Sequence, residues 1–327
     1  MAILVTGGLG YVGCHAVKML VDRGEEVVNL DNLVFGHVEA ACGSEVVIGD
    51  IGDKELLRRI FSTHKIEAVM HFAALADVPE SVADPQKYYI TNVSSSLAML
   101  EVMLDFDCKM MIFSSSAATF GEPEIVPIPE DHPKNPTNPY GRSKLMLEEI
   151  LREYEQAYEM RSISFRYFNA SGADPSGTIG EDHTPEHHLV PIVLQVALGQ
   201  REHVKVYGTD WPTPDGTCVR DYIHVTDLAE AHLLGLKALR NGHKTTAYNM
   251  GNGSGYSVLE VIGMAKEVTG RAIKSIPAER RPGDPAVLVA SSEKITKELG
   301  FEPRYPELRT IIETAWNWHS SHPKGYA

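Results

Sequence analysis

The chain has 327 residues, 43% of them hydrophobic, and a formal net charge of −14. Its length exceeds one average domain, so a cofactor-binding half and a second region are expected. The acidic balance and the lack of a basic cluster argue against nucleic acid or an anionic membrane as a partner. The 4 cysteines stand far apart without a C-x-x-C pair, which fits a reduced, cytoplasmic setting. No basic leader and no apolar run of membrane-spanning length is seen, so neither secretion nor membrane insertion is expected.

Strand and helix patterns alternate along the first half of the chain. Strands are predicted over residues 1–5, 26–30, 45–48, 66–72, 109–113 and 161–168, and helices over 11–23, 54–64, 84–105 and 139–159. This alternation predicts an α/β fold, a doubly wound parallel sheet of Rossmann type with ligands at the carboxyl ends of its strands.

The alternation weakens after residue 168. Loops rich in glycine, proline and polar residues are predicted over 172–188 and 207–218, helices over 191–200, 227–240, 257–269 and 307–319, and a strand over 246–250. We therefore expect an NAD-binding domain over 1–168, to which parts of 221–250 return. A smaller α/β substrate-binding region over 169–327 is expected to be interleaved with it.

A glycine-rich turn joins the first predicted strand to the first helix. In ILVTGGLGYVG, Gly7, Gly10 and Gly13 have G-x-x-G-x-x-G spacing. A turn without side chains lets backbone N–H groups approach a pyrophosphate at the positive end of the helix dipole. Asp31 ends the next apolar run, where a carboxylate would bind an adenosine ribose. No Lys or Arg lies between residues 24 and 53 to receive a 2′-phosphate, so NAD is expected rather than NADP.

Tyr140 and Lys144 lie one turn apart on one face of the predicted helix 139–159. An ammonium beside a phenol stabilises the phenolate and lowers the pKa of the phenol toward that of a usable general base. The Y-x-x-x-K pattern by itself is common on amphipathic helices. Here it follows a strand that runs into Ser114-Ser115-Ser116, downstream of a dinucleotide loop, and this order favours a catalytic pair.

Further motifs continue this order through the chain. They are TGGLGYVG, YGRSK, RYFNASGADP at 166–175, DGTCVRDYIHVTDLAEAH at 215–232 and RRPGD at 280–284. Together they resemble the nucleotide-sugar epimerases of the extended short-chain dehydrogenase/reductase family over nearly the whole chain. The resemblance implies reversible C4 epimerisation of UDP-glucose and UDP-galactose through a 4-keto sugar and enzyme-bound NADH. It also implies a homodimer that pairs helices 84–105 and 139–159 across a twofold axis.

The resemblance also implies site residues. Ser116 matches the catalytic serine, which joins Tyr140 and Lys144 at the sugar 4-hydroxyl. Positions near NAD are Gly7, Gly10, Tyr11, Val12, Gly13, Asp31, Asn32, Asp50, Ile51, Phe72, Ala73, Ala74, Asn92, Ser114, Tyr140, Lys144 and Tyr167. Positions near the UDP-sugar are Ser116, Asn169, His188, Leu189, Tyr207, Arg220, Arg281, Asp284 and Leu288. Within this second set, the two arginines would bind the diphosphate and Tyr207 would lie against uracil.

The chain departs from the family pattern at several positions. Ala76 replaces a frequent lysine, so one cofactor phosphate contact is expected to be missing and NAD to be held less tightly. Phe120 keeps the ring of a usual tyrosine without its hydroxyl, and His188 stands where asparagine is usual in some members. Leu288 occupies a position that admits N-acetyl groups when it is small, which suggests activity on the N-acetylhexosamine pair as well.

Other functions fit the sequence less well. Ala117-Ala118 provide no acid or base for the elimination that 4,6-dehydratases perform. A C4 epimerase of UDP-glucuronate or a pentose sugar, or a noncatalytic NAD-binding protein on the same fold, remain as alternatives. The segments 181–183 and 186–188 hold enough His, Asp and Glu residues for a metal by composition. A polar substrate loop is the favoured interpretation there, and no metal is expected.

Overall fold

The computed structural model describes residues 1–281 and 283–326. The chain divides into two compact units that alternate along the sequence. The first comprises Met1–Gly121, Pro133–Arg166 and Ala229–Tyr248; the second comprises Glu122–His132, Tyr167–Leu228 and the residues from Asn249 to the C-terminus. Among the described helices, none is both long and apolar enough to span a bilayer.

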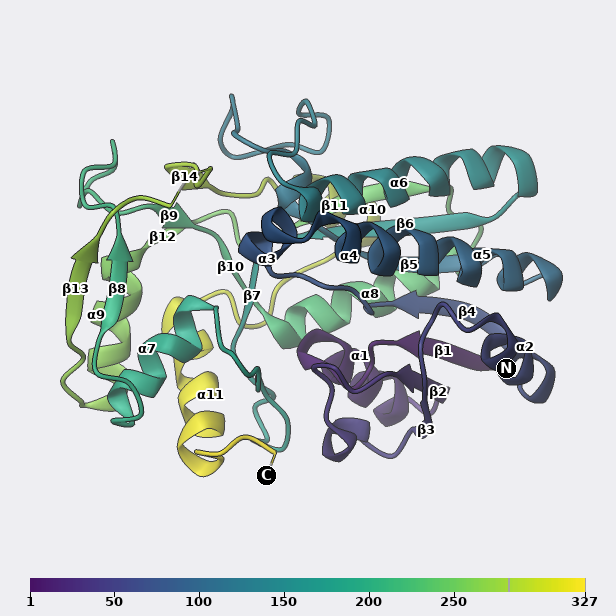
Figure 1. Ribbon diagram of the computed structural model, residues 1–327, viewed down its shortest axis with the longest axis horizontal. Coiled ribbons are helices and arrows are strands. Elements are labelled where there is room, and N and C mark those ends of the chain that lie inside the picture. The colour runs from purple at the N-terminus through teal and green to yellow at the C-terminus, as the bar shows by residue number, and fades with distance from the viewer. Residues whose placement is uncertain (282, 327) are drawn as a thin grey trace. The chain divides into compact units, whose positions relative to one another are not determined.

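The first unit is built on a seven-stranded sheet of order β11-β6-β5-β4-β1-β2-β3 (Figure 1). Its strands are β1 (Ala2–Thr6), β2 (Glu26–Asp31), β3 (Glu45–Ile48), β4 (Ile66–His71), β5 (Met110–Ser116), β6 (Arg161–Tyr167) and β11 (Thr246–Met250). The pairs β1–β2, β1–β4, β2–β3 and β4–β5 are parallel. The predicted α/β sheet of Rossmann type is thereby confirmed, and the carboxyl ends of these strands lie along one edge.

Helices cover both faces of this sheet. They are α1 (Tyr11–Asp22), α2 (Lys54–Thr63), α3 (Val78–Ala83), α4 (Pro85–Tyr89), α5 (Ser95–Asp105), α6 (Pro139–Tyr158) and α8 (Val225–Arg240), with short 3-10 turns at Val38–Ala41 and Ala117–Thr119. Met111 and Phe113 of β5 pack into the core beneath α2, α5 and α6. Ile112, between them, lies under Gly235 of α8 on the opposite face. This alternation is the period of two that a strand buried on both faces requires.

The predicted helix over 84–105 is interrupted. Five residues, Ile90–Ser94, form a π turn between α4 and α5. The turn directs Asn92 inward, where its Oδ1 accepts a hydrogen bond from the Leu75 N–H at 2.9 Å and its Nδ2 donates to the Leu75 carbonyl at 3.0 Å. The helical period is similar with or without one inserted residue, so the sequence pattern did not reveal the π turn.

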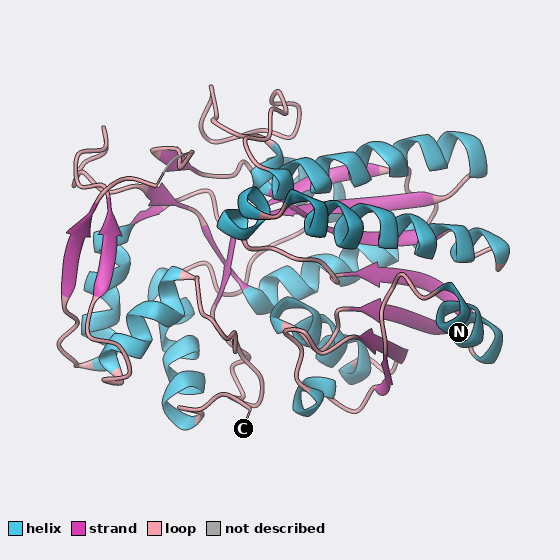
Figure 2. Cartoon of the chain, viewed as in Figure 1, coloured by secondary structure: helices cyan, strands magenta, loops and turns pink. Residues whose placement is uncertain are grey.

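The second unit contains three small sheets beside a cluster of helices (Figure 2). Its strands are β7 (Asn169–Ser171), β8 (Val204–Tyr207), β9 (Val219–Arg220), β10 (Tyr222–His224), β12 (Tyr256–Ser257), β13 (Ser275–Ala278) and β14 (Val287–Leu288). They pair as β10–β7, β12–β9–β14 and β13–β8. The helices are α7 (Leu189–Ala197), α9 (Val258–Thr269), α10 (Glu293–Leu299) and α11 (Leu308–Ser321). Apolar faces of α7, α9 and α11 form the core of this unit together with β8.

Candidate active site

Three glycines of the turn between β1 and α1 have three different environments. Gly7 has φ +70°, and a Cβ there would lie 2.5 Å from the Ala73 nitrogen. A Cβ on Gly13 would lie 2.2 Å from the Gly7 carbonyl oxygen, so this glycine is needed for α1 to pack on the turn. Gly10 has its nearest neighbour at 3.5 Å, and the space beside it is open. A cradle of this kind fits the pyrophosphate of a dinucleotide.

Carboxylates gather at the ends of β2 and β3, next to this turn. Asp31 is buried and accepts hydrogen bonds from the Leu9 N–H at 3.0 Å and the Leu33 N–H at 2.9 Å. Asn32 donates through Nδ2 to Asp50 at 3.1 Å. A Cβ on Gly36 would lie 2.6 Å from a carboxylate oxygen of Asp31, so this position requires glycine. The sequence did not reveal this requirement, because no motif marks Gly36.

The three candidate catalytic side chains come from β5 and α6 of the first unit. The Lys144 ammonium donates to the Ser114 carbonyl oxygen at 2.8 Å and lies 5.8 Å from the centre of the Tyr140 ring. Asn138 caps α6 by accepting from the Gly141 N–H at 2.9 Å, which fixes the first turn that carries Tyr140. Ser116 ends β5 and hydrogen-bonds the Tyr140 hydroxyl. The structure therefore brings this predicted group together.

The pKa values in this group differ from the sequence expectation. Burial raises the pKa of Tyr140, and the hydrogen bond from Ser116 opposes that rise only in part. Burial lowers the pKa of Lys144 to about 7. The pKa of the phenol is thus raised and not lowered as expected. The reason is that both groups have lost water, which disfavours the phenolate and the ammonium alike.

A buried ion pair beneath these residues was not predicted from the sequence. Glu148 of α6 and Arg166 of β6 pair at 2.7 Å, with side chains only 6% and 4% exposed. Ser115 donates to the same carboxylate at 2.5 Å, and the Arg166 guanidinium lies over the Phe120 ring. Ser115 sits between the two serines that contact the candidate catalytic residues, so this network positions the end of β5. An arginine in a strand and a glutamate in a helix carry no sequence signal that they pair.

The second unit holds most of the residues predicted to bind the UDP-sugar. The Arg281 guanidinium lies 4.5 Å from the centre of the Tyr207 ring, and its Nε is 3.2 Å from a carboxylate oxygen of Asp284. Arg220 on β9 is the register partner of Leu288 on β14. Two groups of predicted residues are therefore neighbours in space although they are distant in sequence.

Asp221, next to Arg220, organises this region although sequence analysis gave it no role. Its buried carboxylate accepts from the backbone N–H groups of Asn252, Gly253 and Ala290 at 2.7, 3.0 and 3.0 Å. Its carbonyl oxygen accepts from Asn169 Nδ2 at 2.7 Å. Burial raises the pKa of the Asp221 carboxyl, and the three N–H groups counter that rise. Its place in the DGTCVRDY motif was the available signal.

The remaining predicted residues occupy varied positions. Ala73 lies against Gly7, close enough that its backbone nitrogen would meet any Cβ on that glycine. Ile51 is buried in the loop that follows β3. Tyr167 ends β6 and belongs to the second unit. His188 precedes α7 and directs Nδ1 at Glu181 across 2.6 Å, while Leu189 is the first residue of that helix.

Known proteins resemble this chain over its full length. The model of the NAD dependent epimerase/dehydratase family matches residues 3–251. A UDP-glucose 4-epimerase of Halalkalibacterium halodurans is 54% identical, covering 100% of this chain and 98% of the relative. The structure of a UDP-glucose 4-epimerase from Brucella ovis with NAD has a TM-score of 0.94 at 44% identity, over 96% of this chain and 97% of that one. A UDP-glucose 4-epimerase from Bifidobacterium longum with NAD+ and UDP has a TM-score of 0.94 at 39% identity, over 100% of both chains.

Proposed function

Because this chain belongs to the NAD dependent epimerase/dehydratase family, we propose that it interconverts UDP-glucose and UDP-galactose by inverting C4 of the sugar. It is an NAD-dependent isomerase, and the glycine cradle and the Asp31 carboxylate fit NAD. The observation that carries the proposal is the group Ser116, Tyr140 and Lys144 in the same unit as that cradle. NAD held by these residues would supply the acceptor and donor for the C4 hydride of the sugar.

The residues of the first unit provide the proton chemistry. Tyr140 takes the proton of the sugar 4-hydroxyl and later gives it back, with Ser116 hydrogen-bonding the same oxygen. Lys144, oriented by the Ser114 carbonyl, stabilises the negative phenolate through its charge. A positively charged nicotinamide nearby would favour the phenolate further, which offsets the burial that opposes it.

The residues of the second unit bind UDP. Arg220 and Arg281 suit phosphate oxygens through planar, charge-assisted hydrogen bonds, Asn169 supports them, and Tyr207 offers a ring face to uracil. Inversion requires the 4-keto sugar to present its other face before the hydride returns. Firm binding of the nucleotide with looser binding of the sugar permits that turn without release of the intermediate.

Incubation with UDP-galactose tests the function directly, by following the appearance of UDP-glucose. The variants Tyr140→Phe and Lys144→Ala should lower turnover by roughly 100-fold or more, because each removes part of the proton transfer. Tyr158→Phe, at the exposed end of the same helix, is the matched control and should keep full activity. Near-normal turnover by folded Tyr140→Phe contradicts the assignment, and NAD binding without any turnover of UDP-sugars favours a noncatalytic NAD-binding protein.

The breadth of sugars accepted depends on Leu288. This leucine is half-buried beside Arg220, and a side chain smaller than tyrosine there supports activity on UDP-N-acetylgalactosamine. Comparing kcat/KM for the acetylated and plain substrates tests it. A kcat/KM for UDP-N-acetylgalactosamine thousands of times below that for UDP-galactose rules out activity on N-acetylated sugars. A higher kcat/KM for UDP-glucuronate or a UDP-pentose would replace UDP-glucose and UDP-galactose as the proposed substrates.

We also propose that the protein is a cytoplasmic homodimer. The four cysteines are free, and three of them are buried, which suits a reducing compartment. The outer surface of α5 and α6 carries exposed apolar side chains, Leu97 and Met146 among them, and Leu97 lines a hollow of about 400 Å³. A second copy of the chain would cover that surface.

A further inference from the structure

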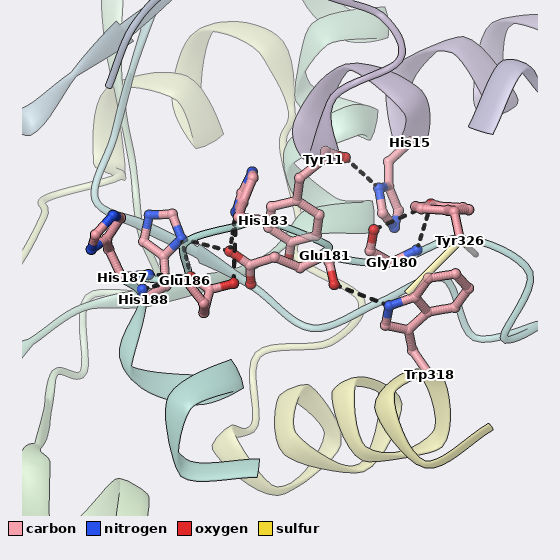
Figure 3. A network of polar contacts seen from close by, with 10 residues as sticks. All are labelled: Tyr11, His15, Gly180, Glu181, His183, Glu186, His187, His188, Trp318 and Tyr326. Carbon is pink, nitrogen blue, oxygen red and sulfur yellow. Dashed lines mark hydrogen bonds and ion pairs between the residues drawn. The ribbon is translucent and has the colours of Figure 1, made fainter. Parts of the chain in front are cut away.

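The loop before α7 brings two carboxylates and two imidazoles to one point (Figure 3). Glu181, His183, Glu186 and His188 each offer one ligand atom, and the four atoms all lie within 4.8 Å of one another. Nδ1 of His188 lies 2.6 Å, and Nδ1 of His183 3.3 Å, from the same Glu181 oxygen. The ligand atoms of a tetrahedral zinc site lie about 3.3 Å apart, so the observed spacing is close to that of a metal shell.

Both carboxylates of this cluster are buried. The side chains of Glu181 and Glu186 are each 3% exposed. Two adjacent buried anions require compensating positive charge, because their desolvation is costly. Protonated imidazoles can supply this positive charge. A single divalent cation bound between the four side chains can supply the same charge without moving them. Lys324 lines the same pocket and adds a positive charge nearby.

Hydrogen bonds hold the residues of the cluster in place. Glu186 Oε1 accepts from two successive backbone N–H groups, those of residues 187 and 188, at 2.7 Å each. The Glu181 carbonyl accepts from the Trp318 indole of α11 at 3.1 Å. Tyr326 hydrogen-bonds the backbone of Gly180 through its hydroxyl, accepting at 3.1 Å. Ligands that are already held in place lose little conformational entropy when they bind a metal. In established metal sites, hydrogen bonds from surrounding residues orient the ligands in the same way.

The cluster is also accessible, and a third imidazole borders it. A pocket of about 200 Å³ is lined by Glu181, His183 and Glu186 and by His319 of α11. His319 therefore faces the same pocket as the cluster. The pocket provides an entry path for an ion and space for an additional ligand.

From this geometry we propose that Glu181, His183, Glu186 and His188 bind one divalent transition-metal ion of the zinc and cobalt class. Two imidazole nitrogens with two carboxylate oxygens suit these ions, whereas Ca²⁺ and Mg²⁺ prefer oxygen ligands alone. The ion replaces the protons of the imidazoles and fastens the loop that leads into Leu189 and α7. Although His188 is also among the residues predicted near the UDP-sugar, the test below measures metal binding and not turnover. The proposed site replaces the expectation of a metal-free polar loop, because composition could not show that these side chains converge.

Cobalt titration of the full chain, purified and treated with a chelator, tests the proposal. We expect one Co²⁺ per chain with the visible absorption of a tetrahedral site, displacement of that ion by Zn²⁺ but not by Mg²⁺, and a higher melting temperature. His183→Gln and His188→Gln should lose the absorption. His203→Gln is the matched control, because His203 lies 3.9 Å from a single exposed glutamate, and it should retain the absorption.

Two results would overturn the proposal. The first is elemental analysis that finds no stoichiometric cobalt or zinc on the wild-type chain after equilibration with excess ion, a result that needs no variant. The second is unchanged cobalt absorption in folded His183→Gln and His188→Gln, checked by circular dichroism, which would place the ion elsewhere.

Discussion

Burial of the Lys144 ammonium lowers the stability of the folded protein. Its pKa is lowered to about 7 by burial, whereas lysine in an unfolded chain has a pKa of about 10.4. Between these values the unfolded chain binds more protons than the folded one, so the stability of the protein rises with pH across that window. The residue therefore destabilises the fold most below pH 7. Lys144 lies beside Tyr140, whose phenolate it stabilises in the proposed reaction.

Lys144→Met should therefore raise the free energy of unfolding of the cofactor-free protein at pH 6, by roughly 2–4 kcal/mol. The gain should shrink as the pH rises to 10, because the folded chain then holds the lysine neutral and the pH approaches the pKa of the unfolded lysine, so that charging it there favours the unfolded chain only slightly. Urea unfolding at pH 6, 8 and 10 measures it in both proteins. Lys297→Met, at an exposed position on α10, is the control and should show no such trend, and a gain independent of pH would contradict the lowered pKa.

At the scale of elements, the Glu148–Arg166 pair joins α6 to β6 and, through Ser115, to β5. Glu148→Gln leaves a buried guanidinium without its counter-charge and should cost about 3–5 kcal/mol of stability. Glu149→Gln, one residue on, breaks only an exposed pair with Arg152 and should change stability by less than about 0.5 kcal/mol. Chemical denaturation compares them, and equal effects would show that burial of the first pair is unimportant.

Substitutions of different glycines in the β1–α1 turn should affect folding stability and NAD binding separately. In Gly13→Ala the new methyl meets the Gly7 carbonyl, so α1 must shift and the melting temperature should fall by several degrees. Gly10→Ala meets nothing closer than 3.5 Å and should fold normally, yet lower NAD affinity about 10-fold or more by filling space beside the cradle. Gly263→Ala in α9 has no neighbour within 4 Å and should stabilise slightly.

Thermal unfolding and fluorescence titration with NAD separate these variants. Unchanged NAD affinity in Gly10→Ala would show that the pyrophosphate does not pass over this glycine.

At the scale of the whole molecule, the proposed homodimer depends on the outer surface of α5 and α6. Leu97 is 38% exposed there, and Leu259 of α9 is 41% exposed in the second unit. Leu97→Glu should produce monomers, because a charge buried in a dimer interface lacks compensation, whereas Leu259→Glu should not change the oligomeric state. Sedimentation velocity measures both. A wild-type monomer at micromolar concentration would rule out this dimer.

Much of the molecule followed from local chemistry in the sequence. Strands buried on both faces, separated by amphipathic helices, predicted the Rossmann sheet, because parallel pairing requires such crossovers. The G-x-x-G-x-x-G spacing and Asp31 predicted NAD, since glycine spacing reports directly on how closely backbone can approach a phosphate. The proximity of Tyr140 and Lys144 was predictable because one helical turn separates them.

Only the tertiary structure decided which distant side chains meet. The π turn at Asn92, the Glu148–Arg166 pair and the backbone contacts of Asp221 each join segments that no periodic pattern connects. The pKa of Tyr140 depends on burial, a property of packing rather than spacing. The convergence of Glu181, His183, Glu186 and His188 is likewise a fact of loop geometry, since irregular backbone has no period from which side-chain direction can be inferred.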